Sequence, residues 1–186
     1  LANELLKQRH LVDIVDNFSR GKKDESLLKI QKKYPDRLKL FEKDLTKKKS
    51  FDSLDSYYDE VYVLASVVGV EFTSKMPDRL LFINSSIILN TCEWLKTVNC
   101  VKVLFTSTSE NYVGAIEKFK YEVPTDENVP VTILDTGDSR STYAITKVLG
   151  ESFFLNYSKK FNFKCVIVRY HNVYGPRMGF KHVIPQ

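Results

Sequence analysis

The chain has 186 residues, of which 43% are hydrophobic and 27% are charged, a composition typical of one globular domain with a real hydrophobic core. Its formal net charge is +5, and the excess lysines lie between Lys22 and Lys49, where acidic residues such as Asp24, Glu25 and Asp44 interleave with them. This pattern favours a solvated surface over a nucleic-acid patch, and a mildly basic chain also suits small ligands that carry a diphosphate.

The cysteines and the hydropathy of the chain point to a reducing, aqueous compartment. Cys92, Cys100 and Cys165 are odd in number and lack a CxxC spacing, so the sequence predicts neither a disulfide framework nor a zinc site. The apolar runs are shorter than the roughly 18 residues of a membrane span, and Leu1 opens no signal peptide. We expect reduced core thiols, no bound metal, no membrane partner and a cytoplasmic location.

Helix and strand patterns alternate along the chain. A helical segment at residues 1–9 precedes an expected strand at 11–15, and a basic, turn-rich region then holds a weaker strand at 38–41. The next strand is expected at 61–65. A long helix follows Pro77, with Leu80, Ile83, Ile87 and Trp94 on one stripe, and a strand at 101–105 comes after it. A helix that contains Tyr143 runs to about Phe161, and the last strand spans 165–169.

Several of these strands are apolar on both faces, which is typical of a parallel sheet covered on both sides. In such sheets, ligands bind beyond the carboxyl ends of the strands. The residues that directly follow each strand are therefore the candidates for a functional site.

Tyr143 and Lys147 are four residues apart on the expected helix, so their side chains lie on one face. A phenol has an ordinary pKa of about 10, and each unit of lowering requires roughly 1.4 kcal/mol of added stabilisation of the phenolate. The Lys147 ammonium and a cationic nicotinamide can supply this stabilisation. The pair is therefore a candidate acid/base pair, although Tyr and Lys are also common on helix surfaces.

In the first half of the chain, candidate cofactor contacts follow three strands. Asp16 and Asn17 follow the first strand, where a carboxylate can accept both ribose hydroxyls of an adenosine and so favours NAD over its 2′-phosphorylated relative. Asp44 follows the second strand and can meet an adenine edge, while Leu64 and Ala65 end the third where a cofactor can pass near the backbone. Considered one at a time, these residues are explained equally well by a structural role in a turn, a helix cap or core packing as by a contact with a cofactor.

The fourth strand ends in a run of hydroxyl side chains closed by Glu110. Thr108 can hydrogen-bond a substrate hydroxyl and relay its proton toward Tyr143, and Glu110 can act as a base or an acid on a neighbouring carbon. After the last strand, residues 170–177 form a polar, turn-forming segment that faces the same edge of the sheet. A Ser/Thr-rich turn is usually only a helix cap, so the case depends on the motifs together.

Four motifs stand in order: Asp16-Asn17-Phe18-Ser19-Arg20-Gly21, the turn Thr108-Ser109-Glu110, the pair Tyr143-xxx-Lys147, and Arg169-Tyr170-His171-Asn172-Val173-Tyr174-Gly175-Pro176-Arg177. Together they resemble the extended short-chain dehydrogenase/reductase family of nucleotide-sugar epimerases, dehydratases and decarboxylases. The resemblance covers nearly the whole chain. It implies an α/β fold, a Rossmann-like doubly wound parallel sheet, that forms part of a NAD-binding domain over residues 1–186.

The resemblance implies that NAD stays bound while a nucleotide-linked sugar is transiently oxidised at C4 and then reduced again. Tyr143 would deprotonate the sugar 4-hydroxyl, Lys147 would bind the nicotinamide ribose, and Thr108 would orient the hydroxyl. Glu110 is the further catalytic candidate. The implied cofactor contacts are Asp16, Asn17, Asp44, Leu64, Ala65, Lys147 and Tyr170, and the implied substrate contacts are Thr108, Asn172 and Arg177. A homodimer built from two helices per subunit, one of them the Tyr143 helix, is also expected.

The reaction that follows C4 oxidation is left open by the sequence. Family dehydratases typically carry an Asp-Glu pair after the Thr, and Ser109 occupies the Asp place here, which weakens the dehydratase interpretation. The Thr-Ser-Glu turn resembles that of nucleotide-glucuronate decarboxylases and of a number of epimerases. We expect an epimerase-type activity, with UDP-glucuronate decarboxylation as the alternative.

The family begins with a strand and a GxxGxxG turn that holds the cofactor pyrophosphate, and nothing of that kind precedes Leu1. The substrate-binding portion that follows the Asn172 segment is also largely absent. By analogy, the absent strand is central in the sheet, so its loss leaves two neighbouring strands with unpaired backbone groups. The chain is therefore expected to be a truncated enzyme or, alternatively, a catalytically inactive interaction module. A short-chain alcohol dehydrogenase is a weaker interpretation, against which the segment from Asn172 to Arg177 argues.

Overall fold

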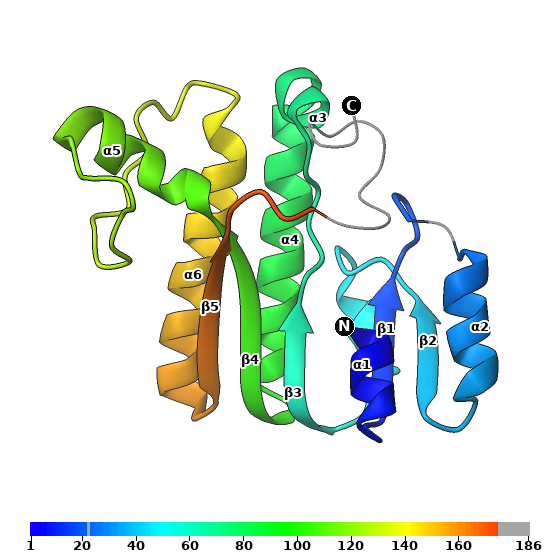
Figure 1. The fold of residues 1–186 in the computed structure, drawn as a ribbon. Coiled ribbons are helices and arrows are strands. Elements are labelled where there is room, and N and C mark those ends of the chain that lie inside the picture. The colour runs from blue at the N-terminus through cyan, green and yellow to red at the C-terminus, as the bar shows by residue number, and fades with distance from the viewer. Residues whose placement is uncertain (22, 175–186) are drawn as a thin grey trace. The chain divides into compact units, whose positions relative to one another are not determined.

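The computed structural model describes residues 1–21 and 23–174. The chain contains two compact units, Leu1–Asp55 and Ser56–Gln186, which we take in turn. In both units the strands are parallel and helices lie between them in the chain, so the predicted α/β class with parallel sheets is confirmed (Figure 1).

The first unit is a small strand–helix–strand element. It contains α1 (Ala2–Lys7), β1 (Val12–Asp16), α2 (Glu25–Lys33), β2 (Leu38–Glu42) and the 3₁₀ turn η1 (Lys48–Phe51). β1 and β2 pair in parallel from Val12 opposite Leu38 to Asp16 opposite Glu42. Asp24 begins α2, because its carboxylate accepts a 2.9 Å hydrogen bond from the backbone N–H of Leu27. Both strands agree closely with the sequence prediction, whereas α2 lies in a region predicted to be mainly turns.

The second unit contains a three-stranded parallel sheet in the order β3-β4-β5. β3 (Tyr57–Val63), β4 (Asn99–Thr108) and β5 (Lys164–Tyr170) each include most of the strand expected there. β3 begins four residues earlier than predicted and ends at Val63, so Leu64 and Ala65 follow the strand. The pairing places Thr106 opposite Val168 and Thr108 opposite Tyr170, which brings the ends of β4 and β5 together.

Two long helices cover one face of this sheet (Figure 1). They are α4 (Pro77–Leu95) and α6 (Ser141–Phe161), and they also pack against each other. Shorter helices, α3 (Val70–Lys75), η2 (Ser109–Tyr112) and α5 (Val113–Phe119), complete the unit. The buried core lies between the helices and the sheet and consists of Val63, Ile88, Cys92, Leu95, Val98, Cys100, Val103, Phe105, Phe154 and Phe163.

The predicted stripe on α4 is only partly right. Leu80 and Ile87 are buried as expected, but Ile83 and Trp94 are half-buried, and the buried face continues instead through Ile88, Cys92 and Leu95. The three cysteines are free thiols, as predicted. Burial raises the pKa of Cys92 to about 12 and that of Cys165 to about 11, so neither is a reactive thiolate at neutral pH.

The described strands form two parallel sheets. Among the described residues, β1 pairs with β2 and β3 pairs with β4, and the two sets form separate sheets.

Candidate active site

Tyr143 and Lys147 lie on the first two turns of α6, as predicted. The Lys147 ammonium is 5.4 Å from the centre of the Tyr143 ring and donates a 2.8 Å hydrogen bond to the backbone carbonyl of Thr106. Lys147 is only 3% exposed, and this burial lowers its pKa to about 8. The ammonium is therefore held between the tyrosine and the end of β4, where it can favour the phenolate form.

Thr108 is the last residue of β4 and is buried. Its Oγ1 accepts a 3.2 Å hydrogen bond from the backbone N–H of Glu110, so it caps the η2 turn. The capping interpretation and the functional one are compatible, because a threonine hydroxyl that accepts one hydrogen bond still has its own proton to donate. The neighbouring Glu110 is exposed, yet partial desolvation of its carboxyl raises its pKa above the ordinary value.

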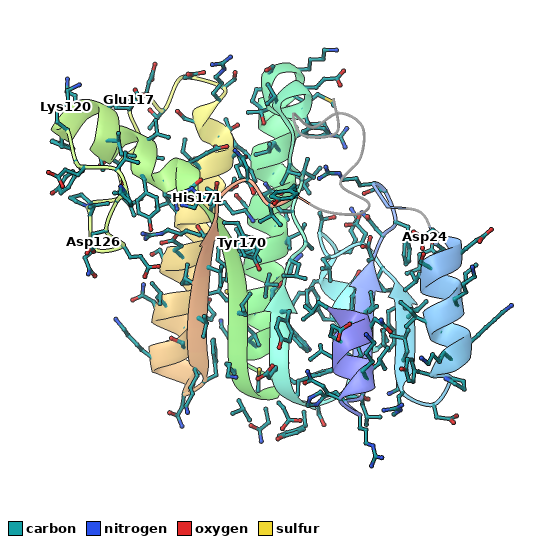
Figure 2. The ribbon with its side chains drawn as sticks, viewed as in Figure 1. Asp24, Glu117, Lys120, Asp126, Tyr170 and His171 are labelled. Carbon is teal, nitrogen blue, oxygen red and sulfur yellow. The ribbon has the colours of Figure 1, made fainter. Side chains whose placement is uncertain are left out.

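The other predicted residues of the second unit border the same strand ends. Leu64 and Ala65 follow β3 and are exposed, and Tyr170 ends β5 with 45% of its surface exposed. Figure 2 shows Tyr170 and His171 at the carboxyl end of β5, where the chain leaves the sheet. Asn172 follows and is exposed. Arg177, the remaining substrate candidate, lies outside the described residues.

Asp16, Asn17 and Asp44 belong to the first unit and all take part in local turns. Asp16 Oδ1 accepts a 2.7 Å hydrogen bond from the N–H of Phe18, and Asn17 Oδ1 accepts one of 3.0 Å from the N–H of Ser19. Asp44 Oδ1 accepts from both the N–H and the hydroxyl of Thr46. Asp16 and Asn17 are exposed and Asp44 is half-buried, so each carboxyl or amide keeps a second polar atom for a ligand.

Sequence reasoning missed Asn84, which links α4 to the segment after β3. Its Oδ1 accepts a 2.7 Å hydrogen bond from the N–H of Val67, and its Nδ2 donates to the carbonyl of Val67 at 3.1 Å and to Thr146 Oγ1 at 3.3 Å. Asn84 is 3% exposed. A polar residue on the buried side of an apolar helix was the available signal, but its partners could not be inferred from spacing.

A buried charged cluster around Glu151 was also missed. Glu151 Oε1 accepts hydrogen bonds from Ser107 Oγ at 2.5 Å, Asn111 Nδ2 at 2.9 Å and Arg169 Nε at 2.9 Å, while its Oε2 accepts from Arg169 Nη2 at 2.7 Å. Desolvation alone would raise the pKa of Glu151, but the hydrogen bonds from Arg169 and Ser107 outweigh it, so the pKa lies below its ordinary value. The carboxylate is thus ionised and fully engaged. The signal in the sequence was its position, four residues after Lys147.

Arg169 extends this cluster beyond Glu151. Its Nη1 donates to the Tyr112 hydroxyl at 3.1 Å and to the backbone carbonyl of Glu127 at 3.2 Å. The guanidinium also lies over the Tyr112 ring, 5.0 Å from its centre. Arg169 was recognised in the sequence only as part of the final motif, and its partners on α6 and η2 come from the fold.

Residues 1–21 and 23–174 contain no cluster of histidine, cysteine or acidic side chains that would hold a metal ion. None of the helices in this part of the chain combines the length and the apolar composition needed to cross a membrane.

The comparisons with known proteins agree with the geometry. UDP-N-acetyl-alpha-D-glucosaminuronate decarboxylase from Bacillus cytotoxicus is 33% identical over 177 residues, which cover 95% of this chain and 51% of that protein. A crystal structure of UDP-galactose 4-epimerase superposes with a TM-score of 0.78 at 25% identity, covering 98% of this chain and 55% of that one.

UDP-N-acetylglucosamine 4-epimerase from Methanobrevibacter ruminantium, solved with UDP-N-acetylmuramic acid, gives a TM-score of 0.76 at 25% identity and covers 94% of this chain and 53% of that one. The chain thus spans about half the length of the relatives it matches. The family described as the NAD dependent epimerase/dehydratase family matches residues 1–186. The chain therefore belongs to the NAD dependent epimerase/dehydratase family.

Proposed function

We propose that the protein acts as a NAD-dependent nucleotide-sugar epimerase/dehydratase-type enzyme, which oxidises a nucleotide-linked sugar transiently at C4 and then reduces C4 again. The observation that carries the proposal is the Tyr143–Lys147 pair. A buried ammonium lies 5.4 Å from the centre of a half-buried phenol at the carboxyl end of a parallel sheet. A phenol beside a cation in this position is suited to take a proton from a sugar hydroxyl and to return it.

The residues around Lys147 suit a NAD molecule. An ammonium has three N–H donors, and the hydrogen bond to Thr106 uses one of them within the described part of the chain. The other two are available to the hydroxyls of the nicotinamide ribose. We assign further cofactor contacts to Leu64, Ala65 and Tyr170. When bound, NAD supplies a reversible acceptor for the hydride that leaves C4.

In the first unit we assign cofactor contacts to Asp16, Asn17 and Asp44. The free oxygen of the Asp16 carboxylate would accept hydroxyls of the adenine ribose, which favours NAD over NADP. Asp44 would meet the adenine edge. Residues 1–186 would together form part of one NAD-binding domain.

The proton chemistry is assigned to side chains of the second unit. Tyr143 removes the proton of the sugar 4-hydroxyl, and Thr108 orients that hydroxyl by donating its own hydrogen. Glu110 is assigned to exchange a proton with a neighbouring carbon, and its raised pKa suits a carboxyl that must both take and give a proton. Asn172 and Arg177 are assigned to the substrate. UDP-linked sugars are the substrate class, as in the names of the similar proteins.

Decarboxylation of a UDP-glucuronate-type sugar is the second candidate. It is favoured by the 33% identity to a UDP-sugar decarboxylase and by Ser109 at the place where family dehydratases carry Asp. After C4 oxidation, the C5 carboxylate leaves as CO₂ and its electron pair is taken up by the C4 ketone. No acid is needed at C6, whereas loss of water from C6 would require one.

Two further proposals concern the oligomeric state of the protein and its location in the cell. We propose a homodimer in which α6 and a second helix of each subunit form the interface. We propose a cytoplasmic location, because the free thiols of Cys92, Cys100 and Cys165 suit a reducing compartment.

Tyr143→Phe tests the proposed function. The purified protein is supplied with NAD⁺ and, in turn, UDP-glucose, UDP-N-acetylglucosamine and UDP-glucuronate, and reduced cofactor and sugar products are followed by absorbance and mass spectrometry. The parent should convert at least one sugar, while Tyr143→Phe should fold, bind NAD⁺ and lose hydride transfer. Tyr157→Phe is the matched control, because that hydroxyl also lies on α6 but bonds Glu93. Undiminished turnover in Tyr143→Phe would remove its assigned role, and a parent inactive with all three sugars would favour a non-catalytic interaction module.

A further inference from the structure

We propose that Glu151 is a positioning residue that holds the turn carrying Thr108 against the Tyr143 face of α6. It acts through Ser107 and Asn111, on either side of Thr108, and Arg169 holds Glu151 in place. The inference rests on the proposed function, since it assigns a role to residues that support the proposed reacting groups.

The three residues Tyr143, Lys147 and Glu151 are spaced four apart on α6, so they lie along one face of the helix. Lys147 is bonded to the carbonyl of Thr106, and Glu151 is bonded to the side chain of Ser107. Two successive residues of β4, which directly precede Thr108, are therefore hydrogen-bonded to the face of α6 that carries Tyr143. The position of the proposed base, Tyr143, relative to the proposed orienting hydroxyl of Thr108 depends on both hydrogen bonds.

A further hydrogen bond to α6 comes from a residue after Thr108. Asn111 Nδ2 donates to Glu151 Oε1 at 2.9 Å and to Ser107 Oγ at 3.1 Å, so both sides of the turn converge on one carboxylate oxygen. The turn from Ser107 to Asn111 is thus closed by side-chain hydrogen bonds as well as by the N–H of Glu110 on Thr108. This leaves Thr108 little freedom to move relative to α6.

The side chain of Asn111 is held in an orientation that is energetically unfavourable for one of its polar atoms. Asn111 is fully buried, and its side-chain oxygen Oδ1 has no hydrogen-bond partner among the described residues. A buried carbonyl oxygen without a donor is unfavourable. The amide therefore keeps its orientation because its N–H groups bond Glu151 and Ser107, which indicates that these contacts determine the conformation of the turn.

Arg169 fixes the position of the Glu151 carboxylate. Its two hydrogen bonds to Glu151 form a bidentate ion pair whose side chains are 19% and 9% exposed, and Arg169 lies opposite Ser107 in the β4–β5 register. Because a buried charge left without its partner is destabilising, a variant of Glu151 can lose stability as well as position. The test must separate the two effects.

The first variant pair changes a single buried hydroxyl. Ser107→Ala removes the contact with Glu151 and leaves the ion pair intact. Thr91→Val is its matched control, because Thr91 is a buried residue on α4 whose hydroxyl donates to the carbonyl of Ile87 in the same helix. With NAD⁺ and the UDP-sugar that the parent converts, Ser107→Ala should lower the single-turnover rate of cofactor reduction on the order of 10- to 100-fold, as expected for a small misplacement of reacting groups. The NAD⁺ dissociation constant and the midpoint of the pH–rate profile should stay at the parent values.

The second variant pair changes the carboxylate. Glu151→Gln should lower the rate at least as much as Ser107→Ala, with the same unchanged pH midpoint, because Glu151 does not itself exchange a proton with the substrate. Glu93→Gln is its control: that carboxylate likewise accepts from a hydroxyl, Tyr157, and pairs with a lysine, Lys96, but on the surface of α4. All rates are measured well below the unfolding midpoint of each variant.

Hydrogen exchange of a peptide covering residues 105–112 is read in the same samples without substrate. Faster exchange there in Ser107→Ala and Glu151→Gln, but not in the controls, together with slower cofactor reduction, is the expected result. Parent-like exchange, a parent-like rate, or a shifted pH midpoint in both variants would overturn the inference. If the parent converts no sugar, the proposed function fails, and parent-like exchange would then still overturn the structural part independently.

Discussion

At the scale of single residues, Lys147 combines burial with charge. Burial lowers its pKa from an ordinary value of 10.5 to about 8, so at neutral pH the side chain is still mostly protonated but is held in its charged form at a cost. That difference corresponds to about 3 kcal/mol of lost stability at pH 7, in order of magnitude. A cation kept at such a cost beside a tyrosine is typical of functional sites.

The pH dependence of stability tests this property. Between about pH 8 and pH 10.5 the unfolded chain binds more protons at Lys147 than the folded chain, so the free energy of unfolding rises with pH in this window. Lys147→Met removes this contribution. Urea unfolding at pH 7 and pH 10 should show the parent gaining up to about 3 kcal/mol relative to Lys147→Met as pH rises. The lost hydrogen bond to Thr106 only adds a constant offset, and parallel curves for the two proteins would contradict the lowered pKa.

One role of Asp16 is seen in the structure and a second is proposed, and a matched control variant separates them. Its Oδ1 stabilises a turn, and we assign its other oxygen to the adenine ribose. Asp16→Ala should weaken NAD⁺ binding by on the order of tenfold, because a hydrogen bond to a carboxylate contributes about 1.5–3 kcal/mol. Asp126→Ala is the matched control, since Asp126 is also exposed and accepts a 2.7 Å hydrogen bond from a backbone N–H two residues on. Both variants should lose similar stability, and equal NAD⁺ affinity in Asp16→Ala and the parent would exclude Asp16 from the site.

The residues predicted from the sequence were those with a local pattern. Tyr143 and Lys147 were proposed because a spacing of four on a helix is visible in the chain itself, and Thr108 because it follows an apolar strand. Glu151 and Arg169 are 18 residues apart, and Asn84 bonds Thr146 across 62 residues. Such contacts depend on how helices and strands pack, which periodicity does not specify.

At the scale of elements, the contact between α6 and β4 determines where the candidate site lies. Gly150 lets the helix approach Phe105, because a methyl group at its Cβ position would lie 2.6 Å from Phe105 Cε1 and still closer to Cζ. The ring cannot move away easily. It is 1% exposed, stacks on Phe154 with centres 4.8 Å apart, and faces the Lys147 ammonium at 5.1 Å.

Gly150→Ala should therefore destabilise the protein in spite of the better helix propensity of alanine. Overpacking costs about 1–3 kcal/mol and the propensity gain offsets at most about 1 kcal/mol, so we expect a net loss of roughly 1–2 kcal/mol in urea unfolding. Since Lys147 and Gly150 share one helical turn, cofactor reduction should slow as well. Gly21→Ala is the control for stability alone, because its added methyl meets no atom within 4 Å apart from those of its chain neighbours. A Gly150→Ala protein as stable as the parent would show that helix and strand are not in tight contact.

Element types were predicted best where the apolar pattern was strong. The end of α6 and both ends of β5 were predicted to within one residue, because the apolar pattern is clear there. α2 was not predicted as a helix, since it has no buried residue and its lysines and acidic residues read as a solvated region. β3 was placed too late because its first residues, Tyr57 to Glu60, are polar or exposed and carry no apolar run.

At the scale of the whole molecule, the sequence predicted the parallel α/β class correctly but did not specify which strands pair with each other. Strand pairing over long range depends on neighbours that a single strand's composition does not reveal. The two compact units differ greatly in their interiors. Both clusters of buried hydrophobic residues that the structure describes lie within residues 56–174, whereas the first unit buries Leu6, Leu38 and Phe51.

This asymmetry predicts the order of unfolding. A unit of this size with few buried side chains gains little hydrophobic stabilisation, so β1 and β2 should open at lower urea concentration than β3, β4 and β5. The single tryptophan, Trp94, packs against the core of the second unit and reports on it alone by fluorescence. Hydrogen exchange of peptides covering residues 12–16 and 38–42 reports on the first unit. The exchange transition should precede the Trp94 transition, which would make unfolding of the chain a process of at least two steps, and coincident transitions would show instead that the two units unfold as one cooperative structure.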